Sequence, residues 1–160
     1  MKCGGFFALT CLAAAAVGWA QGLPRGGDAP RGIPFEVNRV FGAILIKAQV
    51  NKQPATLIVD TGSRHTILSS ELLRVCPRAL EHTDVPAKGS GLVGSAGWAK
   101  ATVEVGTVIW LDRRVLVMND FRDISNSMKQ RVDGILGEDV LKEFSLVVID
   151  FKHQRLVLLR

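Results

Sequence analysis

The amino-acid sequence predicts a mainly β protein, a small closed β-barrel with one or two short helices. Apolar segments of strand length recur along the chain, and turn residues separate them. The chain has 160 residues and 48% of them are hydrophobic, which suits a single domain with a core of its own. Short strands with few helices are typical of a small barrel.

The predicted strands form three hairpins. In the first hairpin, an alternating segment and a turn at residues 51–54 lead into an apolar strand that ends on Asp60. The second hairpin turns about Gly106, and the third turns across residues 152–154. The paired segments are residues 41–50 with 55–60, residues 99–105 with 108–117, and residues 146–151 with 155–159.

Two short helices are predicted. Ser69 or Ser70 can cap a helix over residues 71–75, and Pro77 follows soon after its end. The second helical pattern spans residues 138–144 and directly follows a glycine. Each of these segments lies shortly after one of the two motifs on which the functional prediction depends.

The first motif is Asp60-Thr61-Gly62, which directly follows three apolar residues. A strand of this composition is expected to be buried on both faces. A carboxylate at the end of such a strand costs free energy unless it lies in a polar cleft. Asp60 is therefore the candidate catalytic residue, and the alternative assigns it to an ordinary turn.

The second motif is Asp133-Gly134-Ile135-Leu136-Gly137. An Asp-Thr-Gly motif that is followed later by two apolar residues and Gly resembles the signature of the retropepsin-like aspartic proteases, here a bacterial, exported, single-lobed type. The resemblance covers about residues 34–160 and implies the barrel of the acid proteases, with Asp60 as the catalytic residue. It also implies a bond of Thr61 across a two-fold axis and a close backbone approach at Gly137. The residues implied to support the active site are Thr61, Gly62, Ser63 and Gly137.

The chain contains one Asp-Thr-Gly, whereas the chemistry of this family uses two carboxylates that share a water. A homodimer with one Asp60 from each chain would supply both. Two like charges a few ångström apart do not readily ionise together, so the pair holds one proton. The resemblance implies an aspartic endopeptidase that needs no cofactor and acts on polypeptides. One alternative is a non-cleaving peptide- or protein-binding module in the cell envelope, and another is a structural module whose Asp60 caps a turn.

Two features depart from the retroviral pattern. Ser63 stands where those proteases commonly carry Ala, and its hydroxyl either donates to the catalytic carboxylate or bonds the local backbone. Retroviral members also pair an Asp after the first motif with an Arg after the second. Arg64 and Glu138 occupy these places with the charges reversed, which predicts a salt bridge that braces the active-site loop or the dimer. The alternative is two solvated surface residues.

A glycine-rich run at residues 88–97 lies between the two motifs. Glycine lets a backbone come close to a bound strand, and the flap of the resembled family occupies this place. The run is predicted to be a flap, with a surface loop as the alternative. Because the chain has no Tyr, Trp98 is the candidate to replace the flap tyrosine of the pepsin type, unless it belongs to the core. The predicted flap and substrate-binding residues are Gly89, Gly91, Gly94, Gly97 and Trp98.

Residues 1–20 predict an export signal, with a positive start, an apolar Ala-rich segment and small residues at a cut after Ala20. An uncleaved N-terminal anchor is the alternative, although the apolar segment is short for a membrane span. Residues 21–33 are rich in Gly, Pro and Arg and predict a flexible tether to a protease domain over residues 34–160. The protein is therefore expected to be periplasmic or secreted, with a membrane contact only through that anchor.

Composition argues against other classes of partner. The formal net charge is +5, but Lys and Arg are scattered without interleaved aromatic residues, which argues against nucleic-acid binding. Cys76 has no intramolecular partner once the signal is removed, and a buried thiol is the expectation, with an intermolecular bridge as the alternative. The spacing of His65, His82 and His153 is unlike that of metal ligands, so no metal site is predicted.

Overall fold

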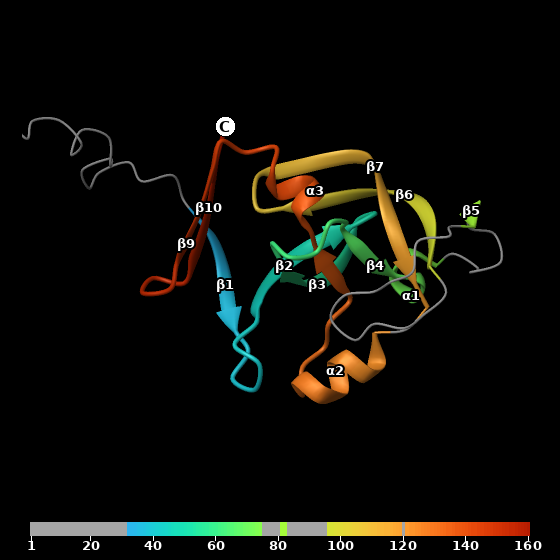
Figure 1. Cartoon of the computed structure of the whole chain (residues 1–160), viewed down its shortest axis with the longest axis horizontal. Coiled ribbons are helices and arrows are strands. Elements are labelled where there is room, and N and C mark those ends of the chain that lie inside the picture. Colours follow the sequence, from blue (N-terminus) through green and yellow to red (C-terminus); the bar gives the residue numbers. More distant parts are fainter. Residues whose placement is uncertain (1–31, 75–80, 83–95, 120) are drawn as a thin grey trace, which may run out of the picture.

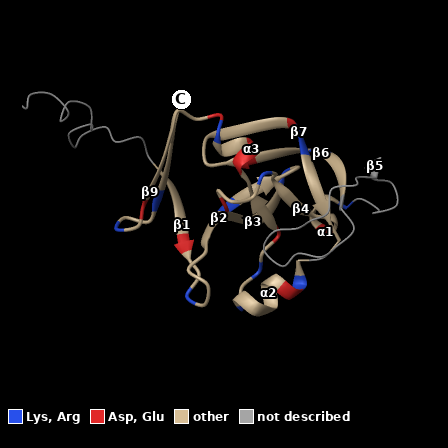
Figure 2. Cartoon of the chain, viewed as in Figure 1, with Lys and Arg blue, Asp and Glu red and all other residues tan. Residues whose placement is uncertain are grey.

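The computed structural model describes residues 32–74, 81–82, 96–119 and 121–160 of the chain (Figure 1). The predicted signal or anchor, most of the predicted tether and Cys76 lie outside the described residues. No helix within the described ranges has the length and apolar character that a bilayer crossing requires. Figure 2 shows Lys and Arg on several elements and interspersed with Asp and Glu.

Most of the described chain is β-strand. The strands are β1 (Ile33–Val37), β2 (Ile44–Val50), β3 (Gln53–Val59), β4 (Ile67–Ser69), β5 (Glu81–His82), β6 (Ala96–Val105), β7 (Val108–Met118), β8 (Gly134–Leu136), β9 (Leu146–Asp150) and β10 (Arg155–Leu159). The helices are α1 (Ser70–Leu73), α2 (Arg122–Met128) and α3 (Glu138–Leu141).

Strands β2, β3, β8, β4, β7 and β6 form a closed barrel. Each strand in this order is hydrogen-bonded to the next, and a pairing of β6 with β2 closes the ring. β3 runs parallel to β8 and β4 runs parallel to β7. The prediction of a mainly β protein with a small closed barrel and few short helices is therefore confirmed.

Three more strands extend the sheet at one side of the barrel. β1 pairs with β2 and also with β10, and β9 forms the outer edge. Figure 1 shows β9 and β10 lying beside β1 as a protruding arm. Phe151 at the tip of this hairpin packs edge-on against Phe35, with ring centroids 5.8 Å apart. In the same turn, a side-chain hydrogen bond with His153 lowers the pKa of Asp150.

The core consists of two clusters that lie on opposite faces of β3. Side chains alternate along a strand, so Leu57 and Val59 join the larger cluster and Ile58 packs against the smaller one. The smaller cluster includes Ile135 of β8 and Met128 of α2. Burial of each large aliphatic side chain contributes about 2 kcal/mol. Packing on both faces therefore fixes the position of β3 and β8, the strands that Asp60 and Gly137 directly follow.

Helix α1 begins close to the predicted position. The side chain of Ser69 is the cap and accepts a hydrogen bond from the Leu72 N–H at 3.0 Å. Helix α2 was not predicted, because its sequence carries neither usual signal of a helix. No side chain caps its first turn, and Met128 is the one buried residue among its seven.

The first predicted hairpin begins later than expected, at Ile44 instead of residue 41. The reason is a turn at Asn38, which is buried. Its Oδ1 accepts hydrogen bonds from the N–H groups of Val40 and Phe41 at 3.0 and 3.1 Å. Its Nδ2 donates to the carbonyl of Met128 at 2.9 Å. Asn38 thereby holds the tip of this turn in a defined position.

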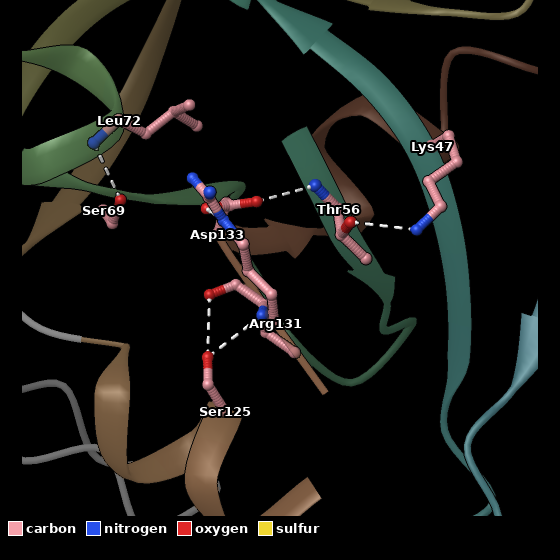
Figure 3. A network of polar contacts seen from close by, with 8 residues as sticks. Lys47, Thr56, Ser69, Leu72, Ser125, Arg131 and Asp133 are labelled. Atoms are coloured by element: carbon pink, nitrogen blue, oxygen red, sulfur yellow. Dashed lines mark hydrogen bonds and ion pairs between the residues drawn. The ribbon is translucent and has the colours of Figure 1, made fainter. Parts of the chain in front are cut away.

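A buried polar network joins β3 to the residue before β8 (Figure 3). Asp133 is 6% exposed, and its Oδ2 accepts a hydrogen bond from the Thr56 N–H at 2.9 Å. The Asp133 N–H donates to the Thr56 carbonyl at 2.8 Å. The hydrogen bond from Arg131 to the other carboxylate oxygen, 2.8 Å long, raises the pKa of Arg131. These bonds fix the start of β8 against β3.

Candidate active site

The two sequence motifs meet at one edge of the barrel. β3 and β8 pair in parallel with Val59 opposite Leu136. The Asp60 N–H continues the ladder and donates to the Leu136 carbonyl at 3.1 Å. Because both parallel strands end at the same edge, Asp60 and Gly137 become neighbours although they lie far apart in the sequence.

The carboxylate of Asp60 is half-buried and is oriented through one oxygen. Oδ1 accepts a hydrogen bond from the Gly62 N–H at 2.8 Å. The Ser63 N–H donates to the Asp60 carbonyl at 3.3 Å, which closes a tight turn. Within the described part of the chain, Oδ2 receives no hydrogen bond. The loop therefore orients the acid through Oδ1, and Thr61 beside it is exposed.

Gly137 lies directly against the loop that follows Asp60. A Cβ atom at Gly137 would come within 2.5 Å of the carbonyl carbon and oxygen of His65 and within 2.9 Å of the Ser63 oxygen. In the same contact, the Glu138 N–H donates to the Ser63 carbonyl at 2.7 Å. The atoms that crowd Gly137 belong to the backbone, so a side chain has no room there.

Ser63 bonds the local backbone. Its hydroxyl donates to the carbonyl of His65 at 2.8 Å, which is the second of the two alternatives that the sequence left open. The bond stabilises the turn after the motif. The carboxylate of Asp60 accepts its hydrogen bond from the Gly62 N–H instead.

The salt bridge predicted between Arg64 and Glu138 does not form within the chain. Both side chains are exposed, and among the described residues neither takes part in an ion pair. A neighbouring pair joins the loop to α3: Asp139 Oδ1 accepts from the Thr66 N–H at 2.9 Å and from its hydroxyl at 2.7 Å. Successive side chains of a helix point in directions about 100° apart. The side chain that faces the loop therefore belongs to Asp139 and not to Glu138, the preceding residue, which the sequence comparison had indicated.

Thr66 and Asp139 are the residues that the sequence prediction overlooked. Thr66 follows the first motif on the same loop, and Asp139 stands in the first turn of α3. Their residue types offered a signal, because a Thr hydroxyl and a carboxylate at a helix start commonly bond backbone N–H groups. The register of the two segments, which depends on the antiparallel pairing of β4 with β8, was needed to pair them.

The predicted flap lies only partly within the described residues. β5 pairs with the start of β6, with His82 opposite Gly97, and the two strands flank the segment between them. Gly89, Gly91 and Gly94 lie outside the described residues. Gly97 lies within β6 and is buried.

Trp98 connects the base of this hairpin to the active-site loop. It is half-buried and packs against the smaller core cluster. Its ring meets the ring of His65 edge-on with centroids 5.0 Å apart, and the Arg114 guanidinium lies 4.4 Å from its centroid. Trp98 therefore contributes to the core, as one of the two alternatives expected, and it also contacts the loop of Asp60.

An oriented, half-buried carboxylate can take a proton from a bound water or supply one to a leaving group. Hydrolysis of a peptide bond by water requires both of these steps. Asp60 supplies one carboxylate.

No cluster of three or more His, Cys, Asp or Glu side chains that could hold a metal ion occurs in the described ranges.

Comparison with known families finds one matching model. The family described as "gag-polyprotein putative aspartyl protease" matches residues 46–143, more than half of the chain. The matched region contains Asp60, Gly137 and both residues of the contact between Thr66 and Asp139. No curated protein matches the chain.

Comparison with solved structures finds similar folds. A retropepsin-like aspartic protease from Rickettsia conorii has a TM-score of 0.56 and 21% identity over 79% of this chain and 86% of that one. The retroviral protease-like domain of Ddi1 from Leishmania major has a TM-score of 0.47 and 20% identity over 72% and 87% of the two chains. The EIAV protease in complex with the inhibitor HBY-793 has a TM-score of 0.47 and 16% identity over 66% and 90%. The first of these likenesses shows a common fold.

Proposed function

The chain belongs to the gag-polyprotein aspartyl protease family, and on this premise we propose that it is an aspartic endopeptidase. Its active form is a homodimer in which two copies of Asp60 share one water. The observation that carries the proposal is the geometry of Asp60 at the edge of the barrel. One carboxylate oxygen is held by the Gly62 N–H at 2.8 Å, and the loop leaves the other available to a water or a second carboxyl group.

In the proposed reaction the pair of Asp60 residues carries one proton, because two like charges in contact do not both ionise readily. The ionised member takes a proton from the water, which attacks the peptide carbonyl. The protonated member donates a hydrogen bond to that carbonyl and later supplies a proton to the leaving amine. The Gly62 N–H keeps the carboxylate oriented throughout.

The surface around Asp60 supports a dimer. Ile44 pairs with Val59, so the turn before β2 lies beside Asp60. Val40 and Phe41 on this turn are 55% and 62% exposed, and Asn38 holds them in place through two hydrogen bonds. Two large apolar side chains that are exposed on one turn suit a face that a second chain covers.

Replacing Phe41 by Ser is expected to weaken the dimer at least about fivefold, because truncation of a central aromatic contact in an interface typically costs more than about 1 kcal/mol. The side chain is mostly exposed, so the fold should persist. Sedimentation equilibrium measures the change in the dimer dissociation constant. Leu111→Ser is the matched control, since Leu111 is 75% exposed on a distant part of β7 and should leave the constant unchanged. An equal effect of both substitutions would contradict the assignment of this face.

Ser63→Ala is expected to leave the acid limb of the pH–rate profile where it is in the wild type. The hydroxyl donates to the His65 carbonyl and not to the carboxylate, so its removal costs about 1 kcal/mol of stability through the lost hydrogen bond. Rates measured over the acidic and neutral range, together with thermal unfolding, test both parts. A displaced acid limb would mean that Ser63 contacts the carboxylate in the active dimer.

The proposed activity is tested by incubating the chain without residues 1–20 with an unfolded protein, with and without a statine peptide that mimics the transition state. The expected result is fragments whose formation the statine peptide blocks. Binding of peptide without cleavage would support the non-cleaving module instead. A dimeric, folded chain that neither cuts nor binds would overturn both.

We also propose that the protein is exported, on the evidence of residues 1–20. Expression of the chain with and without this segment, followed by cell fractionation, tests the proposal. Recovery of both forms in the cytoplasm would contradict it. The mass of the recovered chain distinguishes a cleaved signal from a retained anchor.

A further inference from the structure

We infer that Thr66 and Asp139 are positioning residues that hold the loop of Asp60 in its reactive geometry, an inference that rests on the proposed function. Thr66 has no exposed surface. Its N–H and its hydroxyl both donate to Asp139 Oδ1, at 2.9 and 2.7 Å. The same hydroxyl accepts a hydrogen bond from the Gly137 N–H at 3.2 Å. One side chain therefore joins the end of the loop to both the second motif and the helix that follows it.

Hydrogen bonds attach the loop to the end of the second motif and to the start of α3 at three points. It begins with the bond from the Asp60 N–H to the Leu136 carbonyl, 3.1 Å long. Its middle is held by the bond from the Glu138 N–H to the Ser63 carbonyl, 2.7 Å long. Thr66 and Asp139 close it at the far end. Because Thr61, Gly62 and Arg64 between these points are exposed, packing alone does not fix them.

Asp139 is itself well anchored. Val140 and Leu141, which follow it in α3, are buried in the main core. The Arg113 guanidinium on β7 donates to the Asp139 carbonyl and pairs with Glu143. The Trp110 ring N–H donates to the other carboxylate oxygen of Glu143 at 2.9 Å. These contacts hold Asp139 in place, so that its carboxylate can fix the position of the loop.

The energetics favour a role in positioning. Hydrogen bonds to a carboxylate are stronger than bonds between neutral groups, and the shared oxygen receives two from one residue. A displacement of about 1 Å in a reacting group can lower a rate about 100-fold. Loss of the attachment at Thr66 would release the loop that orients Asp60 while the barrel beneath it stays intact.

The test compares variants that remove the contact with variants that retain it. Asp139→Ala removes the contact and Thr66→Val removes the bonds made by the hydroxyl, whereas Asp139→Asn keeps an acceptor oxygen and Thr66→Ser keeps the hydroxyl. We expect the first two to lower kcat about 10- to 100-fold with little change in KM, and the last two to retain most of the activity. Asp123→Ala, at an exposed position in α2, is the control.

Active-site titration with a tight-binding statine peptide separates positioning from a merely structural role. A structural role lowers the number of competent sites and leaves the rate per site unchanged, and that result would overturn the inference. Amide hydrogen exchange gives a readout independent of cleavage. Faster exchange at the N–H groups of Asp60 and Glu138 in Asp139→Ala and Thr66→Val, but not in Asp139→Asn, is expected.

Exchange rates equal to those of the wild type at both amides would also overturn the inference. A wild-type chain that does not cleave would refute the proposed endopeptidase, and the exchange measurement would still decide whether the contact holds the loop. Thr66→Val retains the shape of the side chain, so the test remains available if Asp139→Ala does not fold.

Discussion

Replacing Asp60 by Asn is expected to abolish peptide-bond cleavage and to leave the fold and the dimer intact. The amide oxygen of Asn can still accept the hydrogen bond that Gly62 donates to Oδ1 at 2.8 Å, so the loop keeps its geometry. The amide cannot take a proton from the water, however. The loss should reach at least about 10⁴-fold, the upper end of what a positioned acid or base contributes, because both members of the pair change.

Thermal unfolding and the mass in solution serve as controls for Asp60→Asn, and both should match the wild type. A variant that hydrolyses the unfolded substrate at the wild-type rate would refute the catalytic assignment. A folded variant that no longer associates would show that the carboxyl group also holds the dimer together.

Mixing Asp60→Asn with the wild-type chain tests the shared site directly. If the two chains exchange freely, equal amounts give wild-type dimers as about one quarter of all dimers. Activity per wild-type chain should therefore fall to about half of its value before mixing. A chain that carried a complete site would keep its activity per wild-type chain unchanged.

Replacing Gly137 by Ala is expected to give the largest loss of stability among single substitutions at the site. The new Cβ would lie 2.5 Å from the carbonyl carbon and oxygen of His65 and 2.9 Å from the Ser63 oxygen. Overpacking of this kind costs about 3 kcal/mol, at the upper end of its range because backbone atoms have little freedom to yield. The φ of Gly137 is −94°, which any residue adopts, so the requirement for glycine is one of space.

Denaturant unfolding of Gly137→Ala measures this loss, and a lower midpoint with an unchanged slope is expected. Gly62→Ala is the matched control in the same loop. Among the described residues, a Cβ at Gly62 meets only the Asp60 Oδ1 atom, at 3.2 Å, so its effect on stability should stay below about 1 kcal/mol. Equal midpoints for the wild type and Gly137→Ala would contradict the close packing of the two motifs.

Several elements of the fold were predictable because their signals are local. The apolar strand that ends on Asp60 and its hairpin partner follow from alternation and a turn between them. Helix α1 follows from its serine cap, and the C-terminal hairpin β9–β10 follows from two apolar segments around a short turn. The family was predictable from Asp60-Thr61-Gly62 and the second motif, because each is a short pattern of neighbouring residues.

The sequence alone thus predicted the barrel and the family and made Asp60 the candidate for catalysis, because strand patterns and short motifs are local features of the chain. The tertiary structure decided that the contact of Thr66 with Asp139, instead of a salt bridge between Arg64 and Glu138, joins the loop to α3, and that the Ser63 hydroxyl bonds the backbone. It also decided the closure of the barrel by β2 and β6 and the contact of Trp98 with His65. These contacts join segments far apart in the chain, and which side chains face one another depends on strand register and helix rotation, which packing of the whole core sets.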